Sequence, residues 1–422
     1  MEPRSFGVRF IGFNRIYSLF RLWYNILIRF IHKAYKNIIP EAEQAINAIK
    51  SDKPNAKTTW FHCASLGEFE QARPLIEQIK SKQHNSIIVV TFFSPSGYEI
   101  RKNYEHADAV FYLPIDTQSN ATKFVNAIKP DNVVIVKYEF WRNMLRAVKK
   151  YNANLIIISA PFRKSMPFFK PWGNMWRNMI NLFDQIYVQN DESKMLLQSI
   201  NINDNVFVAG DTRFDRVLNV THTARRIETI EQFADGKKMM IAGSTWQEDM
   251  DAIIPLIQNS VQKKKQWKFI VAPHEINQTK IDEIIRKMPE VKVAKFTQLE
   301  NVDLKNVDLL IIDCIGILTS IYQYGTIAYV GGAFKTGLHN ILEPAAWGMP
   351  VVFGPIYHKF IEAHELIELG GAKAVHNSEE LNSAVQNFER NIDEAAQIAA
   401  NYVKNKCGAT KIIIDNAPKL TN

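Results

Sequence analysis

Short apolar segments alternate with helix-like segments along most of the chain from residue 58 onward. Strands alternating with helical patterns are typical of parallel sheets built from β-α-β crossovers. The chain contains two such series, and we interpret the polar stretch between them, from Asp211 to Lys237, as the interdomain connection. The predicted strands are Thr58–Cys63, Ser86–Thr91, Ala109–Leu113, Asn132–Val136, Asn154–Ser159, Gln185–Val188, Phe207–Ala209, Lys238–Ala242, Trp267–Ala272, Val291–Ala294, Val307–Ile312, Ile327–Val330 and Val351–Phe353.

This pattern predicts an α/β protein with two Rossmann-like, doubly wound domains that face each other across a cleft. A chain of 422 residues is long enough for two full cores. We expect a basic segment over residues 1–40, an N-terminal domain over 41–212 and a C-terminal domain over 213–422, with the last helix free to pack back on the N-terminal domain. Ligands of such sheets bind beyond the carboxyl ends of the strands, so the residues after each strand are the candidates for function.

The first forty residues form a cationic amphipathic pattern, without an acidic residue between Glu2 and Glu41. Three arginines interrupt any window of roughly 20 apolar residues, the length that a transmembrane span needs. We therefore predict a helix that lies on an anionic membrane surface. A helix docked on its own domain and a spanning anchor are the alternatives. The polar stripe consists of Asn14, Ser18, Arg21, Asn25, Arg29, His32 and Lys36.

The composition of the chain limits the classes of partner that we expect for it. A net charge of +8 fits nucleic acid, an anionic membrane surface or an acidic substrate. The sequence shows no recognisable nucleic-acid module, and its lysines are scattered, so we expect no nucleic-acid partner. The three cysteines, Cys63, Cys314 and Cys407, are far apart and odd in number, which argues against a disulfide framework. No metal-ligand spacing is visible, and we expect neither a metal nor thiol chemistry.

Two carboxylates follow strands in the first half of the chain. Glu68 falls in the first turn of a predicted helix, where the helix dipole should lower its pKa and keep it ionised, ready to accept a proton. Ordinary charge complementarity at a helix start explains the same residue equally simply. Glu139 lies among aromatic residues after another strand, at the same predicted edge. A packed strand-to-helix turn is the alternative there.

Several strand ends in the second half are suited to a nucleotide. Ser244 and Thr245 place two hydroxyls beside a glycine, a combination suited to phosphate oxygens. The segment 331–343 runs from a strand through three glycines to a predicted helix start at Asn340, where backbone N–H groups can meet an anion. Asn340 and Glu343 also fit a capping box, which would satisfy only the helix itself. The concentration of such loops favours a nucleotide site in the C-terminal domain.

An ordered set of short motifs resembles the 3-deoxy-D-manno-octulosonic acid (Kdo) transferases of Gram-negative lipid A biosynthesis. The similarity extends over about residues 58–375. No single block is specific to this family, but the set of blocks in this order is specific to it. The blocks are Ala64-Ser-Leu-Gly-Glu68, Leu113-Pro-Ile-Asp116, Tyr138-Glu-Phe-Trp141, Ala209-Gly-Asp-Thr-Arg-Phe-Asp215, Gly243-Ser-Thr245, Gly331-Gly332, His339-Asn-Ile-Leu-Glu343 and Gly354-Pro355.

The resemblance implies a GT-B glycosyltransferase on the cytoplasmic face of the inner membrane of a Gram-negative bacterium. Its donor would be CMP-Kdo and its acceptor a lipid A precursor, lipid IVA. Glu68 matches the family's catalytic base in an inverting reaction that needs no metal or other cofactor. Glu343 matches the carboxylate that typically holds the ribose hydroxyls. The positions that match the CMP site are Pro273, His274, Ile315, Gly316, Ile317, Asn340, Ile341, Leu342 and Glu343.

Two positions depart from the family pattern, which usually has Arg at the position of His274 and Glu at that of Ile317. His274 replaces a fixed cation with a group that is near neutral at pH 7. A GT-B transferase that uses another nucleotide sugar on a lipid-linked acceptor is an alternative. So is a catalytically silent nucleotide-binding protein at the membrane.

Overall fold

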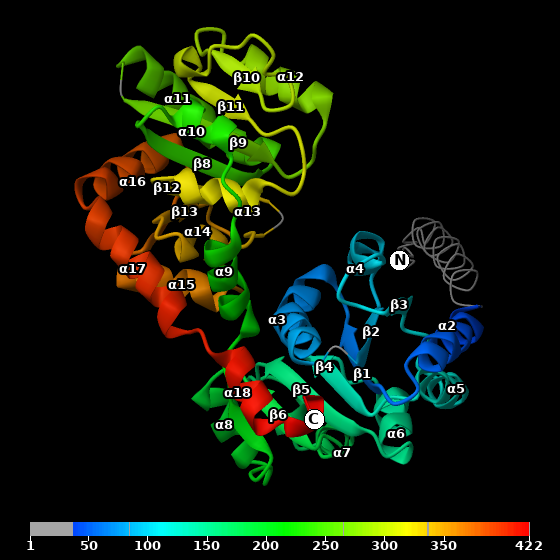
Figure 1. The fold of residues 1–422 in the computed structure, drawn as a ribbon. Helices are drawn as coiled ribbons and strands as arrows, with labels where there is room; N and C mark the ends of the chain where they lie inside the picture. Colours follow the sequence, from blue (N-terminus) through cyan, green and yellow to red (C-terminus); the bar gives the residue numbers. More distant parts are fainter. Residues whose placement is uncertain (1–36, 84, 265, 336, 422) are drawn as a thin grey trace, which may run out of the picture. The chain divides into compact units, whose positions relative to one another are not determined.

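The chain forms two compact units, each of which is described by itself. The computed structural model describes residues 37–421 except 84, 265 and 336 (Figure 1). Unit 1 comprises Met1–Gly210 together with Thr410–Asn422, and unit 2 comprises Asp211–Ala409. The division thus falls two residues before the expected boundary, and the last residues of the chain group with unit 1. The predicted membrane-associated helix lies outside the described residues.

Unit 1 is built on a seven-stranded sheet with the order β3-β2-β1-β4-β5-β6-β7, and all of its strand pairs are parallel. This order reverses between β1 and β4, as in Rossmann-type sheets. The carboxyl ends of β1, β2 and β4 therefore meet at one edge. The strands are β1 (Lys57–Cys63), β2 (Ser86–Phe92), β3 (Ala109–Tyr112), β4 (Asn132–Val136), β5 (Asn154–Ala160), β6 (Gln185–Val188) and β7 (Val206–Val208).

Helices cover both faces of this sheet because its side chains alternate between two cores. Trp60 of β1 points into the core under α2, α5 and α6, whereas Phe61 and Cys63 point into the core under α3 and α18. Figure 1 shows α3 on the opposite side of the sheet from α5. The helices of unit 1 are α2 (Ile38–Asp52), α3 (Leu66–Lys82), α4 (Pro95–Arg101), α5 (Gln118–Ile128), α6 (Arg142–Lys150), α7 (Asn174–Ile180), α8 (Asp191–Gln198), α18 (Ala409–Asn416) and the 3₁₀ turns η1 (Pro167–Phe169) and η4 (Pro418–Leu420).

Unit 2 is built on a second seven-stranded parallel sheet, with the order β10-β11-β9-β8-β12-β13-β14. Here β8 and β12 lie side by side in the middle, so the loops after them meet. The strands are β8 (Lys238–Thr245), β9 (Trp267–Pro273), β10 (Val293–Lys295), β11 (Leu309–Ile311), β12 (Ile327–Val330), β13 (Val351–Phe353) and β14 (Ala372–Ala374).

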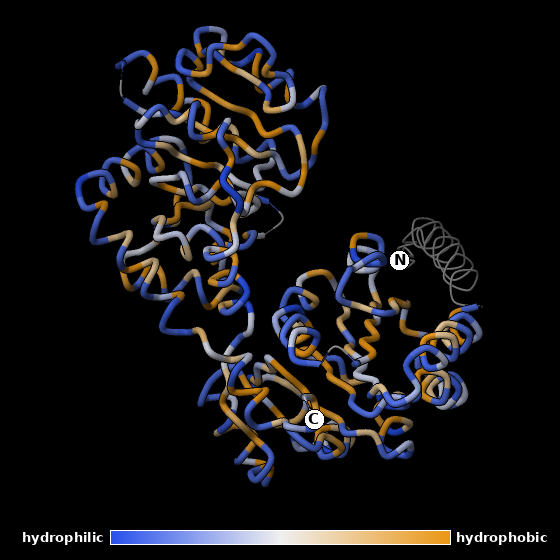
Figure 2. Tube along the Cα trace, viewed as in Figure 1, coloured by the Kyte–Doolittle hydropathy of each residue, from blue (hydrophilic) through white to orange (hydrophobic). Residues whose placement is uncertain are grey.

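The unit 2 sheet also separates two cores, and Figure 2 shows hydrophobic segments running through the middle of each unit. One core packs under α11, α12 and α16, and the other under α9, α10, α14, α15 and α17. The helices are α9 (Thr212–Thr223), α10 (Glu228–Ala234), α11 (Gln247–Gln262), α12 (Gln278–Arg286), α13 (Leu318–Ile321), α14 (Leu342–Ala346), α15 (Ile361–Leu369), α16 (Ser378–Arg390), α17 (Ile392–Asn405) and the 3₁₀ turns η2 (Leu304–Asn306) and η3 (Tyr322–Tyr324).

The predicted fold class of two parallel α/β sheets is confirmed, and each predicted strand overlaps an observed one. The interpretation of Asp211 to Lys237 as a connection is wrong, because α9 and α10 occupy most of it and pack on unit 2. The sequence analysis missed β14, which is three residues long and carries an exposed lysine in its middle. A strand of three residues is too short to show an alternation of apolar and polar positions.

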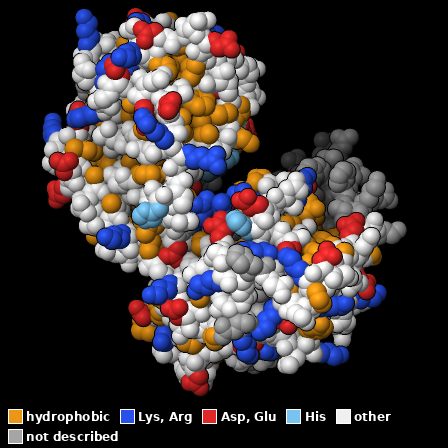
Figure 3. Space-filling view, in the orientation of Figure 1, with side chains coloured by type: hydrophobic (Ala, Val, Ile, Leu, Met, Phe, Trp, Pro, Cys, Tyr) orange, Lys and Arg blue, Asp and Glu red, His pale blue; other side chains and the backbone are white. Residues whose placement is uncertain are grey.

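Charge is spread over the surface. Figure 3 shows lysine and arginine side chains distributed over the visible face of both units, interspersed with acidic ones. Among the helices of residues 37–421, none is both long and apolar enough to cross a membrane.

Candidate active site

Glu68 lies where the end of β1 turns into α3. It occupies the first turn of that helix, as the sequence predicted, and only 9% of its surface is exposed. Its carboxylate accepts a hydrogen bond from the backbone N–H of Ala64, in the turn that precedes the helix. The turn therefore fixes the direction of the carboxylate. Burial and a fixed direction are what a general base needs.

The prediction that the helix start lowers the pKa of Glu68 is wrong. Burial and the nearby charge of Glu139 raise this pKa from its ordinary value of 4.5 to about 7, although the N–H groups of Ala64 and Ser65 and the charge of Lys137 act in the opposite direction. Desolvation outweighs the dipole because the carboxylate is nearly inaccessible to water. A carboxylate with a pKa near 7 is a better proton acceptor at neutral pH than an ordinary one.

Glu139 is held beside Glu68 by aromatic neighbours. It follows β4, and its Oε2 accepts a hydrogen bond of 2.8 Å from the indole N–H of Trp141. The same oxygen lies 3.7 Å from Nε2 of the buried His62 on β1. Phe93, which is half exposed at 47%, packs its ring 4.9 Å from that of Trp141. Two carboxylates and an aromatic wall thus share the carboxyl edge of this sheet.

In unit 2, three strand-end loops meet in a stack of rings. His274 lies between Trp246 and His339, with ring centroids 4.6 and 4.4 Å away and interplanar angles of 26° and 24°. The indole N–H of Trp246 also donates to Nε2 of His339, at 3.1 Å. Burial and the nearby His274 lower the pKa of His339 to about 4, so this ring is neutral at pH 7. The stack brings together the loops after β8, β9 and β12.

The buried carboxylate of Asp249 joins the turn after β8 to the glycine loop after β12. Its Oδ2 accepts from the N–H of Trp246 and of Gly332, at 2.8 and 2.9 Å, and its Oδ1 accepts from the hydroxyl of Tyr329 at 2.8 Å. A Cβ on Gly331 would lie 2.3 Å from the carbonyl oxygen of Ser244, so only glycine permits this close approach.

Asn340 and Glu343 are in contact, but the predicted capping box at Asn340 is wrong. Helix α14 begins at Leu342, whose N–H donates to Oδ1 of Asn340 at 3.1 Å. The side-chain amide of Asn340 donates to Oε1 of Glu343 at 3.1 Å, and the hydroxyl of Thr319 donates to Oε2 at 2.9 Å. Asn340 and Thr319 thus fix the direction of the Glu343 carboxylate.

Thr319 links this carboxylate to the loop after β11. Gly316 there has a φ of 92°, which favours glycine, and Ile315 is 87% exposed. Ile317 immediately precedes α13, which contains Thr319. By contrast, the side chains of Ile341 and Leu342 are buried in the core, so these two positions can offer a ligand only backbone atoms. The N–H of Leu342 is already bonded to Asn340.

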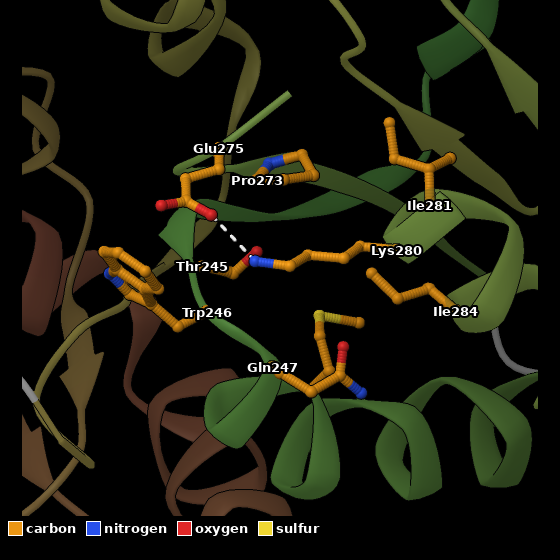
Figure 4. Close-up of a pocket in the computed structure, with 9 residues that line it drawn as sticks. Thr245, Trp246, Gln247, Pro273, Glu275, Lys280, Ile281 and Ile284 are labelled. Carbon is orange, nitrogen blue, oxygen red and sulfur yellow. Dashed lines mark hydrogen bonds and ion pairs between the residues drawn. The ribbon is translucent and has the colours of Figure 1, made fainter. Parts of the chain in front are cut away.

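A small pocket lies between α11 and α12 and is lined by Thr245 and Pro273 (Figure 4). Its cavity volume of about 20 Å³ admits a water molecule but no nucleotide. Lys280 forms an ion pair of 2.7 Å with Glu275 at this pocket. The hydroxyl of Thr245 is buried and has no hydrogen-bond partner among the described residues, so a water there would satisfy it. Ser244 beside it is half-buried, with a left-handed φ of 54°.

Burial raises the pKa of Cys63, Cys314 and Cys407, and a raised pKa keeps a thiol protonated. In the part of the chain that the structure describes, no three histidine, cysteine, aspartate or glutamate side chains lie close enough together to hold a metal.

Five residues of these sites were not identified as functional candidates from the sequence. Trp246 and Asp249 had a usable signal, because an acidic residue three positions into a helix is typical of a capped start. His339 was part of a quoted motif, but nothing in the sequence indicates that it stacks on His274. The contacts of His62 and Thr319 join segments that are distant in the chain, so no local pattern could reveal them.

Comparison with known proteins shows which proteins this chain is similar to. A family model described as "3-Deoxy-D-manno-octulosonic-acid transferase (kdotransferase)" matches residues 40–216. The 3-deoxy-D-manno-octulosonic acid transferase of Aquifex aeolicus is 28% identical over 315 residues, which cover 74% of this chain and 80% of that protein. A bifunctional glycosyltransferase/methyltransferase of Fusobacterium nucleatum is 24% identical over 404 residues, or 92% of this chain. The chain spans only 62% of that longer relative.

The fold has solved counterparts. UDP-GlcNAc 2-epimerase from Neisseria meningitidis, bound to UDP-GlcNAc, matches with a TM-score of 0.61 at 15% identity, over 86% of this chain and 100% of that one. The two Rossmann-like units thus have a GT-B-like fold. By sequence, the chain is similar to the Kdo transferases.

Proposed function

We propose that this enzyme transfers Kdo from CMP-Kdo to a lipid A precursor, lipid IVA, with Glu68 as the catalytic base. The observation that carries the proposal is the buried, oriented carboxylate of Glu68, whose pKa is raised to about 7, in a chain whose relatives include Kdo transferases. The raised pKa supports proton transfer at neutral pH.

In the proposed reaction, an acceptor hydroxyl attacks the anomeric carbon of Kdo from the face opposite the leaving group. The new bond joins the acceptor oxygen to that carbon, and the bond from the carbon to the phosphate oxygen of CMP breaks. Glu68 takes the hydroxyl proton, and CMP leaves with the bonding electron pair. A single displacement of this kind inverts the anomeric carbon, and we propose that it needs no metal.

We propose that CMP binds to the strand-end loops of unit 2. Glu343, held by Asn340 and Thr319, would accept hydrogen bonds from the ribose hydroxyls. The loop containing Gly316 and the exposed Ile315 would lie against the base or the sugar. His274, within the ring stack, stands where the family usually has arginine. The remaining proposed contacts are Ser244, Thr245, Pro273, Ile317, and the backbone of Ile341 and Leu342.

We also propose that residues 1–40 lie on the inner membrane of a Gram-negative bacterium, at its cytoplasmic face. The support is the cationic amphipathic pattern of this segment and the nature of the proposed acceptor, an anionic lipid.

The test is incubation of the purified protein with CMP-Kdo and lipid IVA, with the glycolipid product identified by its mass. We expect Kdo addition and CMP release, and kcat/KM should rise with pH through about 7 as Glu68 loses its proton. Glu68→Gln should lower kcat by roughly 10²–10⁴. Glu70→Gln changes a carboxylate of the same helix that pairs with Arg101 and Arg73, and should alter kcat less than about threefold.

Two results would overturn the proposal. Absence of Kdo in any glycolipid product would refute the assigned activity, and near wild-type turnover of Glu68→Gln would refute the assigned base.

A further inference from the structure

His62 on β1 has an unexplained polar atom. The ring is 1% exposed, and its Nε2 has no hydrogen-bond partner among the described residues. Buried polar atoms in native proteins are nearly always paired, so an unpaired one needs a reason. The residue is the second-last of β1, at the carboxyl edge of the sheet that carries Glu68 and Glu139.

The other ring nitrogen indicates where the proton lies. Nδ1 of His62 is 2.9 Å from the hydroxyl oxygen of Thr91, directly opposite on β2. That oxygen accepts a hydrogen bond of 2.8 Å from the indole N–H of Trp60, which can only donate. The hydroxyl proton of Thr91 can go to Nδ1 at 2.9 Å or to the carbonyl of Phe61 at 3.5 Å. The shorter contact is the stronger one, so Nδ1 accepts and Nε2 carries the proton.

This tautomer directs an N–H group at a carboxylate. Nε2 of His62 is 3.7 Å from Oε2 of Glu139, slightly beyond hydrogen-bond distance. A shift of less than 1 Å in the Glu139 side chain would form the bond. The indole N–H of Trp141 already donates to the same oxygen at 2.8 Å. The two donors approach Glu139 from different elements, β1 and the loop after β4.

We propose that His62 is a positioning residue for the transfer reaction, whose Nε2–H donates to Glu139 and holds that carboxylate beside Glu68. Trp60 contacts Thr91, Thr91 contacts His62, and His62 would contact Glu139. This inference rests on the proposed function, because Glu68 is the base that the arrangement serves.

The electrostatics of the edge agree with this role. The titratable and charged groups there are Glu68, Glu139, Lys137 and Cys63, and the charge of Glu139 is one cause of the raised pKa of Glu68. A hydrogen bond from Nε2–H of His62 would fix the position of the Glu139 carboxylate relative to Glu68. Without the His62 donor, Glu139 would keep the hydrogen bond from Trp141 but lose its second donor, and its carboxylate would be less closely fixed beside Glu68.

Two variants of His62 distinguish the roles of its two ring nitrogens. The amide of His62→Gln reaches the position of Nε2, whereas the amide of His62→Asn reaches only that of Nδ1. With CMP-Kdo and lipid IVA, we expect kcat to fall about tenfold or more in His62→Asn and to stay within about threefold of wild type in His62→Gln. The KM for CMP-Kdo should not change in either, because His62 belongs to unit 1. Equal losses in both variants would contradict the proposal.

A measurement without turnover tests the contact itself. In the full-length protein with ¹⁵N-labelled histidine, His62 is assigned by the signals that His62→Gln lacks. We expect the neutral Nε2–H tautomer, and we expect Glu139→Gln to shift the Nε2 resonance. An Nδ1–H tautomer, or no response to Glu139→Gln, would overturn the assignment. If the wild-type protein makes no Kdo product, the proposed function fails, while this spectrum still decides whether His62 contacts Glu139.

Discussion

At the scale of single residues, Glu68 shows how burial can override a local electrostatic rule. The first turn of a helix stabilises a carboxylate, and the hydrogen bond from Ala64 acts in that direction. Removing the group from water next to Glu139 costs more than this gains, so the pKa rises to about 7. The burial of Glu68 therefore lowers the stability of the fold at neutral pH, a cost that the proposed role as a base would explain.

This cost predicts that Glu68→Gln stabilises the protein at high pH. The unfolded carboxyl loses its proton near pH 4.5, and the folded one near 7. The contribution of Glu68 is thus fully favourable below about pH 4.5 and is lost as the pH rises through 7. The rise of this pKa from 4.5 to about 7 corresponds to about 3 kcal/mol. Thermal unfolding at several pH values measures it.

The same variant serves as its own control at low pH. Near pH 4.5 the wild-type side chain is neutral like glutamine, so the two proteins should unfold at similar temperatures. At pH 8.5 Glu68→Gln should unfold at a higher temperature. A difference that does not depend on pH would show that Glu68 is not buried with a raised pKa.

At the scale of elements, the loops of unit 2 are held by hydrogen bonds that cross between strands. Asp249 on α11 fixes the loop after β12, and Thr319 on α13 fixes the carboxylate of α14. Helix α14 has five residues, too few to be stable by itself. Its position therefore depends on these contacts and on core packing.

We predict that Asp249→Ala destabilises unit 2 by about 3 kcal/mol, because the N–H groups of Trp246 and Gly332 and the hydroxyl of Tyr329 lose a buried acceptor. Urea unfolding followed by Trp fluorescence measures this loss. Asp251→Ala is the control on the same helix, since that side chain is 69% exposed and pairs only with Lys287 in the described residues. It should change stability by less than about 0.5 kcal/mol. Equal losses of stability in the two variants would show that the hydrogen bonds of Asp249 do not stabilise unit 2.

For the N-terminal segment, we predict binding to vesicles that contain anionic lipid, weakening as salt is added. The charge attraction of its arginines and lysines is screened within about 8 Å at 0.15 M salt. Co-sedimentation of the full chain at low and high salt measures it, with zwitterionic vesicles as control. Attachment that salt does not affect would favour a spanning anchor instead.

At the scale of the whole molecule, a GT-B-like fold is shared by enzymes with different nucleotides. The match to a UDP-GlcNAc epimerase shows the fold, while the family model and the relatives show the similarity to Kdo transferases. Nucleotide preference thus separates the proposed function from a transferase that uses another nucleotide sugar.

We predict that CMP binds this chain more tightly than UMP or UDP, by at least about tenfold, because a site that hydrogen-bonds one base leaves polar groups unpaired with another. Isothermal titration of the full chain measures the three affinities. Glu343→Gln should weaken CMP binding if Glu343 accepts from the ribose. Tighter binding of UDP would refute a CMP-linked donor.

The sequence alone determined the two parallel sheets and the position of Glu68 in a helix start. The alternation of strands with helices and the motifs at strand ends are local patterns, so they can be recognised without knowledge of the fold. Strands β4 and β12, for example, contain runs of consecutive apolar residues. Only the tertiary structure decided what surrounds these residues. The pKa of Glu68 depends on Glu139 from another segment, and the His274 stack joins three loops. Burial and side-chain contact between distant segments are properties of packing, which no local pattern encodes.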